Sequence, residues 1–202
     1  MKLILVTQPT YFVEEDKIIT ALFEEGLDYM HLRKPDTPPM YAERLLTLIP
    51  EQYHKRIIVH GHFYLKDEFK LKGIHLNERN TTPPDRYKGP KSCSCHSLDE
   101  LRALKAQHDY VLLSPVFDCI TDAPTPAAFT AGQLRQASRS GLIDKHVIAM
   151  GGIDDSNVAL IKDYGFGGAA IAGCIWSKFD RCSTHDFSEL IRYFRTIKKI
   201  VD

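Results

Sequence analysis

Several residues of a catalytic type close short β-prone runs of the chain. His31 and Arg33 end the run YMHLR, and Ser94 and His96 end the run KSCSCH. An imidazole exchanges protons near neutral pH, and a guanidinium binds phosphate or carboxylate oxygens in pairs. The pattern predicts a site where Arg33 helps to hold an anion and His96 acts as general acid or base. In the alternatives, His96 only caps a helix and Arg33 only pairs with a carboxylate of its own chain.

Two later runs end in glycine. Gly151 and Gly152 follow VIAM, and Gly173 follows Ala172, the last residue of AAIA, where a helical segment opens. A backbone without Cβ approaches phosphate oxygens closely, and N–H groups at a helix start favour an anion. These turns predict a phosphate site built from main-chain amides. The alternative is that the glycines only permit tight strand-to-helix turns.

Histidines gathered from several runs also raise a metal hypothesis. His31, His60, His62 and His75 stand at or near the ends of three runs, and imidazoles from several strands can bind zinc. Against this, no Asp or Glu stands at the other run ends to complete a hydrolase-type centre. We therefore expect no metal among these residues.

These residues need a scaffold that brings the run ends together. Eight β-prone runs alternate with helical segments, which predicts parallel strands joined by crossover helices. The runs are Leu3–Thr7, Tyr29–Arg33, Arg56–His60, Gly73–His75, Lys91–Cys95, Tyr110–Leu113, Val147–Met150 and Ala169–Ala172. We expect one α/β domain over residues 1–202, a single (β/α)8 TIM barrel whose active site lies at the carboxyl ends of its strands. The alternative is an open doubly wound sheet. A nucleotide-binding sheet of that kind is less favoured, because no G-x-G-x-x-G motif follows the first run.

The segments between the runs carry helix signals. Apolar residues recur at helical spacing within Asp16–Glu25 and Asp186–Ile200. Ser97 and Glu100 form a capping-box pattern at the start of another helix. The segment Asn80–Pro90 is too rich in proline for a full helix. We expect a shortened fourth unit and a closing C-terminal helix.

Composition favours a small-molecule partner. Lys plus Arg equals Asp plus Glu, 26 against 26, so no net field attracts nucleic acid or an anionic membrane. The apolar run before Thr7 is too short for a signal peptide or a membrane span. Five cysteines fit no disulfide framework, and Cys93 and Cys95 share one strand face as packing residues. We expect a cytoplasmic protein; its oligomeric state, a homo-oligomer included, stays open.

Seven ordered motifs resemble the thiamine phosphate synthase/TenI superfamily over nearly the whole chain. They are LILVTQP, MHLRKP, KGIHL, SCSCHSLDEL, DYVLLSPVF, VIAMGGI and GFGGAAIAGCI. The resemblance implies a barrel that acts in thiamine biosynthesis on a thiazole phosphate.

The chain departs from the synthase branch at its magnesium and lysine positions. The resemblance places two magnesium-holding Asp within His60-Gly61-His62 and at Asn80, where this chain has none. Pro35 stands where a synthase Lys belongs, with Lys34 adjacent as a candidate substitute. The motif after the sixth run keeps Thr121 but has Asp122 where the synthase pattern has a Lys. Losing both carboxylates and the lysine should raise the activation free energy of a diphosphate reaction by several kcal/mol.

The resemblance instead implies a TenI-like thiazole tautomerase, because His96 matches the catalytic His of that branch. Such an enzyme aromatises a thiazole carboxylate phosphate tautomer by proton transfer and needs no cofactor. The remaining candidate residues bind substrate or phosphate in this hypothesis: Arg33, His31, Ser94, Thr121, Gly151, Gly152, Ala172 and Gly173. The first alternative is a magnesium-dependent synthase that joins a pyrimidine diphosphate to the thiazole phosphate. The second is a non-catalytic paralogue that binds a thiazole or thiamine phosphate.

Overall fold

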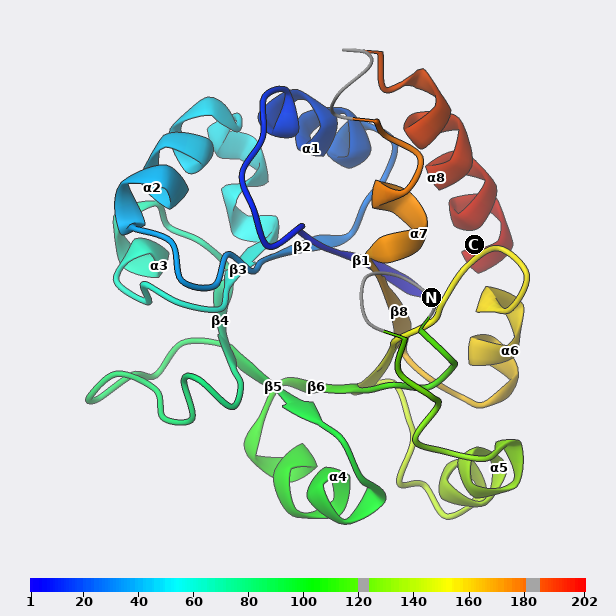
Figure 1. The fold of residues 1–202 in the computed structure, drawn as a ribbon. Helices are drawn as coiled ribbons and strands as arrows, with labels where there is room; N and C mark the ends of the chain where they lie inside the picture. Colours follow the sequence, from blue (N-terminus) through cyan, green and yellow to red (C-terminus); the bar gives the residue numbers. More distant parts are fainter. Residues whose placement is uncertain (120–123, 181–185) are drawn as a thin grey trace.

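The computed structural model describes residues 1–119, 124–180 and 186–202 (Figure 1). Eight parallel strands pair in sequence order and close into a barrel, which confirms the predicted (β/α)8 architecture. The strands are β1 (Lys2–Val6), β2 (Tyr29–Leu32), β3 (Ile57–Val59), β4 (Gly73–Leu76), β5 (Lys91–Cys95), β6 (Tyr110–Leu113), β7 (Val147–Met150) and β8 (Gly168–Ile171). Closure leaves no free sheet edge, and the carboxyl ends of all strands meet on one rim.

Helices surround this barrel (Figure 1). They are α1 (Glu15–Glu24), α2 (Pro39–Leu48), α3 (Leu65–Glu68), α4 (Leu98–Leu104), α5 (Ala131–Arg139), α6 (Val158–Asp163), α7 (Gly173–Trp176) and α8 (Ser188–Val201), with 3-10 turns at Glu51–Arg56 and Lys105–Gln107. The chain between β4 and β5 forms no helix, as its prolines predict. Half of the predicted capping box forms at α4. Ser97 accepts a hydrogen bond from the Glu100 N–H, but the Glu100 carboxylate accepts from the N–H of His96 instead of Ser97.

The strands divide their side chains between two layers. Outward residues, Cys93 and Cys95 among them, pack in the apolar layer under the helices. Inward residues fill the barrel, and one half of that interior is apolar. Its buried members are Ile4, Val6, Leu112, Ile148 and Ala170.

The other half of the barrel interior is polar. His31, His75 and Ser92 are completely buried, from β2, β4 and β5 respectively. Burying such groups is costly unless each one is hydrogen-bonded. The groups are hydrogen-bonded in two sets: His31 bonds to His60 and Tyr110, and His75 bonds to Ser92 and Ser94.

An aromatic residue of α7, the helix after β8, contacts the end of β1. Trp176 ends α7, and its indole N–H donates to the Val6 carbonyl at 2.8 Å. Phe12 meets the indole edge-on, with ring centroids 5.8 Å apart. The contact adds to the backbone pairing of β8 with β1, next to the carboxyl rim. No helix within the described ranges is long and apolar enough to cross a membrane.

Candidate active site

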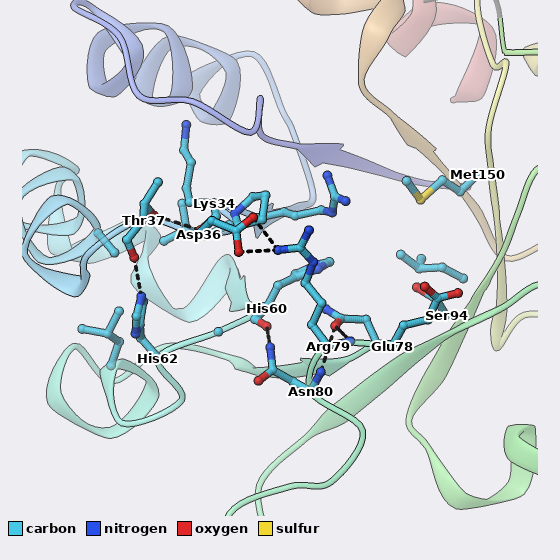
Figure 2. A pocket seen from close by; sticks show the side chains of 18 of the residues that line it. Lys34, Asp36, Thr37, His60, His62, Glu78, Arg79, Asn80, Ser94 and Met150 are labelled. Atoms are coloured by element: carbon cyan, nitrogen blue, oxygen red, sulfur yellow. Dashed lines mark hydrogen bonds and ion pairs between the residues drawn. The ribbon is translucent and has the colours of Figure 1, made fainter. Parts of the chain in front are cut away.

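A cavity of about 640 Å³ opens at the carboxyl ends of the strands. Most of its lining comes from the carboxyl ends of β2 to β7 and the segments that follow them, and Tyr11 comes from the loop after β1. Figure 2 shows many of its polar side chains. The polar residues of its lining are Lys34, Asp36, Thr37, His60, His62, Asn77, Glu78, Arg79, Asn80, Ser94, His96 and Ser114, together with Tyr11 and Arg33. The position on the rim agrees with the general location of barrel active sites.

The predicted site residues divide into two groups in the structure. Arg33, Ser94 and His96 line the cavity together. His31 lies beneath it with no exposed surface. The turn residues of β7 and β8 are not part of this lining: Gly151, Gly152, Ala172 and Gly173. Thr121 lies outside the described residues, and the ligand roles of all these positions stay predictions.

Arg33 presents a free cation to the cavity. Its backbone is pinned to β1, because its N–H donates to Thr7 Oγ1 at 2.9 Å and the Thr7 hydroxyl donates to its carbonyl at 3.2 Å. In the part of the chain that the structure describes, no side chain pairs with its exposed guanidinium. Two carboxylates near it in sequence are engaged elsewhere, since Glu14 binds Lys17 and Asp36 binds Arg79. The geometry favours the anion-binding role over the internal ion pair.

Lys34 does not replace the lysine that is missing at Pro35. Its Nζ binds both carboxylate oxygens of Glu15 at 2.5 and 2.7 Å and the Thr10 carbonyl at 2.8 Å. Both side chains of the Lys34–Glu15 pair are nearly inaccessible, 3% and 1% exposed. In Figure 2, Lys34 extends away from the other labelled polar groups. Its charge is therefore neutralised inside the protein.

Arg79 is a cavity residue that the sequence analysis missed. Its Nη1 donates to both oxygens of Asp36 at 2.6 Å, joining the loop after β4 to the loop after β2 (Figure 2). This hydrogen bond raises the pKa of Arg79 further above its ordinary value. The pair is exposed, so an incoming anion can compete with Asp36 for the guanidinium.

The two positions where the resemblance places magnesium-holding Asp do lie together. A Cβ on Gly61 would stand 3.9 Å from Asn80 Nδ2. The Asn80 amide donates to the His60 carbonyl at 2.9 Å, so its nitrogen faces this place. Magnesium requires oxygen donors, usually with at least one carboxylate. The residues at this place do not fit that ion.

His96 is held in a form suited to proton transfer. Its Nδ1 lies 3.0 Å from the Ser114 carbonyl, so the ring donates from Nδ1 and Nε2 is bare in the neutral imidazole. The His96 backbone N–H donates to Glu100 Oε2 at 2.7 Å, which fixes the start of α4. The main chain thus serves the helix, and the exposed ring stays available to the cavity.

The β7 glycines are required by packing. Gly151 and Gly152 have positive φ, 94° and 63°. A Cβ at Gly151 would come within 2.7 Å of Pro115, and one at Gly152 within 2.5 Å of the Asp118 carbonyl. The close approach of the loop after β6 is by itself a sufficient reason for both glycines. This agrees with the alternative in which they serve only a tight turn.

Three buried histidines form a cluster at the bottom of the cavity: His60 lines the cavity, and His31 and His75 lie beneath it. His31 Nδ1 lies 2.9 Å from His60 Nε2, and the His60 ring stacks on His75 with centroids 4.1 Å apart. One ligand nitrogen from each lies within 4.8 Å of the others. Burial lowers the pKa of His31 to about 3, and it lowers the pKa of His60 and His75 well below their ordinary value. All three imidazoles are neutral near pH 7.

A family model described as thiamine monophosphate synthase matches residues 3–175. The chain belongs to this family. Among curated proteins it is 25% identical over 189 residues to a thiamine-phosphate synthase of Serratia proteamaculans, covering 89% of each chain. It is 24% identical over 177 residues to one of Desulfitobacterium hafniense, covering 82% of this chain and 83% of that protein.

Solved structures agree with this assignment. A thiamine phosphate pyrophosphorylase from Bacteroides thetaiotaomicron is 55% identical, with a TM-score of 0.92, and the match covers 100% of this chain and 98% of that one. One from Pyrococcus furiosus, 19% identical over 99% of this chain and 95% of its own, shares the fold with a TM-score of 0.77. The superfamily prediction is confirmed. The named relatives are synthases, which supports the first alternative of the sequence analysis better than its tautomerase prediction.

Proposed function

We propose that the protein is a transferase of the thiamine-phosphate synthase type, which joins a pyrimidine diphosphate to a thiazole phosphate. The observation that carries the proposal is the guanidinium of Arg33, which pairs with no side chain of the described residues, on a polar cavity at the barrel rim. The volume of about 640 Å³ falls within the range of small-molecule sites. The names of the similar proteins supply thiamine phosphate as the product, and the family resemblance supplies the two substrates.

The cations of this cavity suit a departing diphosphate. In the reaction, the C–O bond between the pyrimidine methylene and the diphosphate breaks, and the thiazole nitrogen forms a C–N bond to that carbon. Negative charge grows on the leaving oxygen, and a fixed guanidinium stabilises it. Arg33 is free for this role, and Arg79 joins it when the anion displaces Asp36. No step is assigned to magnesium, because Gly61 and Asn80 offer no carboxylate.

The test is a direct assay of both products. Pyrimidine diphosphate and thiazole phosphate are incubated with the protein, and thiamine phosphate and diphosphate are quantified with magnesium and after chelation. We expect stoichiometric formation of both, and a rate about 10²-fold lower in Arg33→Gln, the usual cost of one charge-stabilising donor. Arg102→Gln is the matched control, since Arg102 pairs with Asp99 on α4 away from the cavity. Absence of product under both metal conditions refutes the proposal.

A second function is favoured by the geometry of His96. Its Nδ1 is held by the Ser114 carbonyl, so a bare Nε2 is available as a base on the same cavity. This supports aromatisation of the thiazole carboxylate phosphate tautomer, which needs a proton moved on the ring. Conversion of that tautomer, followed by ultraviolet absorbance, tests it. Binding of the phosphate without conversion in either assay would indicate a binding protein.

A further inference from the structure

Three of the described residues that line the cavity carry a permanent positive charge: Arg33, Lys34 and Arg79. Lys34 is neutralised by the buried Glu15, so its charge is not available to a ligand. Arg33 pairs with no side chain of the described residues. Arg79 is bound to Asp36, but both side chains are exposed, at 57% and 79%. Arg79 is therefore the second cation that an anionic ligand of the cavity can reach.

Asn80 anchors the loop that carries Arg79. Its side-chain amide donates to the His60 carbonyl at 2.9 Å, which ties the loop after β4 to the residue that follows β3. The Asn77 side-chain oxygen accepts from the N–H groups of Arg79 and Asn80 at 2.9 and 3.1 Å. Backbone hydrogen bonds join Asn77 and Asn80 in both directions, each at 3.0 Å. The main chain of Arg79 is thus fixed on the rim, while its long side chain is exposed.

This use of Asn80 differs from the role that the resemblance gives to its position. An aspartate there, with a second one at Gly61, would supply the carboxylates that hold magnesium on a diphosphate. In this chain the Asn80 amide nitrogen faces Gly61, and the preceding residue, Arg79, is a cation. Figure 2 shows the Arg79 side chain extending from this loop to Asp36. The loop therefore offers the positive charge of a side chain where the family would offer ligands for an ion.

The reaction of the proposed function needs such a charge when the diphosphate departs. The diphosphate leaves with the electron pair of the C–O bond, while the thiazole nitrogen uses its own electron pair to form the C–N bond. A fixed positive charge near the leaving oxygen lowers the activation free energy of this step. A diphosphate has several oxygens that can pair with a guanidinium, and it carries more charge than a carboxylate. It should therefore take Arg79 from Asp36, because exposed ion pairs are weak.

We propose that Arg79 takes the place of magnesium in this protein, so that the transfer proceeds without a divalent cation. In the free protein Asp36 holds the guanidinium at the cavity, and in the complex the guanidinium binds the diphosphate. The inference rests on the proposed function for its reaction. It adds the residue that supplies the charge of the missing ion, and it predicts that the reaction does not depend on metal.

The first test measures the affinity for inorganic diphosphate by calorimetry, without turnover and with a chelator present. Arg79→Gln should weaken binding about 10- to 100-fold, the cost of a charged hydrogen bond. The loss should persist when Asp36 is already replaced, because the guanidinium contacts the anion itself. The double variant Asp36→Asn with Arg79→Gln is therefore compared with Asp36→Asn alone. Equal affinities of these two would show that Arg79 serves only its ion pair, and would overturn the proposal.

Arg102 and Asp99 supply the matched control. They form an exposed pair with the same 2.6 Å contact, and neither residue belongs to the cavity lining. Arg102→Gln should leave the diphosphate affinity unchanged, both in the wild type and in Asp99→Asn. A loss as large as that of Arg79→Gln would indicate a general effect of net charge, and it would also overturn the proposal.

The second test measures turnover with magnesium and after chelation. We expect chelation to leave kcat unchanged, and Arg79→Gln to lower kcat about 10²-fold in both conditions, because the charge on the leaving oxygen is greatest in the transition state. If chelation abolishes turnover, the proposal fails, and Glu78, the second carboxylate among the described residues of the lining, becomes the candidate ligand of the ion. If no product forms in either condition, the proposed function fails, and the diphosphate affinities alone decide whether Arg79 binds the anion.

Discussion

Removing the ammonium group of Lys34 should destabilise the protein strongly. Lys34 and Glu15 are 3% and 1% exposed, and the ammonium also lies 4.4 Å from the centre of the Tyr11 ring. Lys34→Met keeps much of the side-chain volume but removes the ammonium that binds both oxygens of the buried Glu15 carboxylate. Breaking a buried pair in this way costs about 3–5 kcal/mol. In a chain of this size, that corresponds to a fall in melting temperature of roughly 6–20 °C.

The contribution of the Lys34–Glu15 pair to the free energy of unfolding is measured by a double-mutant cycle in urea and by thermal melts. Lys34→Met combined with Glu15→Leu removes both charges, and it should recover most of the loss because the buried carboxylate is removed together with its ammonium. Lys17→Met is the control, since Lys17 pairs with Glu14 while 63% exposed, and such surface pairs contribute about 0–1 kcal/mol. A loss below about 1 kcal/mol in Lys34→Met, or a double variant as unstable as the single, would refute the buried-pair argument.

Three further predictions concern the cavity and the buried histidines. Arg33→Gln should weaken binding of inorganic phosphate about 10- to 100-fold by calorimetry, the cost of a charged hydrogen bond, whereas Arg102→Gln should not; equal affinities would remove Arg33 from the anion site. His96→Ala should slow aromatisation of the tautomer about 10²- to 10⁴-fold, and an unchanged rate would end the role of its Nε2 as base. The lowered pKa values of His31, His60 and His75 mean that the unfolded chain takes up protons below about pH 6.5 while the native state does not. The contribution of these histidines to the free energy of unfolding should therefore be constant above that pH and fall toward pH 5 by up to about 1.4 kcal/mol per pH unit for each of the three. A free energy of unfolding in urea that does not change between about pH 6.5 and pH 5 would contradict this prediction.

The strands were predictable because their local pattern is strong. The predicted bounds of β5, β6 and β7 agree with the structure at both ends. β8 begins one residue earlier than predicted, at Gly168. A glycine there indicates a turn from sequence, but a Cβ at this position would lie 2.6 Å from the Lys2 carbonyl. The contact with β1 that selects glycine is not visible in the local sequence.

The site was predictable only as far as position along a strand determines it. Arg33, Ser94 and His96 reach the cavity, as residues at strand ends should. His31 points into the barrel like Arg33, two residues later, but lies below the cavity floor. How deep an inward residue lies depends on the stagger between strands, which the sequence of one strand does not contain.

Two other features had no signal in the sequence. Arg79 meets Asp36 only because two loops from different units approach each other. Tyr110 stands at the beginning of β6, where an argument from strand ends does not look, and its hydroxyl reaches His31 across the interior. Both depend on side-chain reach between elements that are distant along the chain.

The tie between Trp176 and Val6 also gives the protein an optical probe. Trp176 is the only tryptophan of the chain, is 5% exposed, and follows Gly173 by three residues. An indole in such dry surroundings fluoresces at shorter wavelengths than one in water, and its emission responds to the hydrogen bond at its nitrogen. Occupation of the β8 turn by a phosphate would change this emission, whereas a ligand confined to the wall near His62 would not. The chain thus carries a label-free report of which side of the rim a ligand uses.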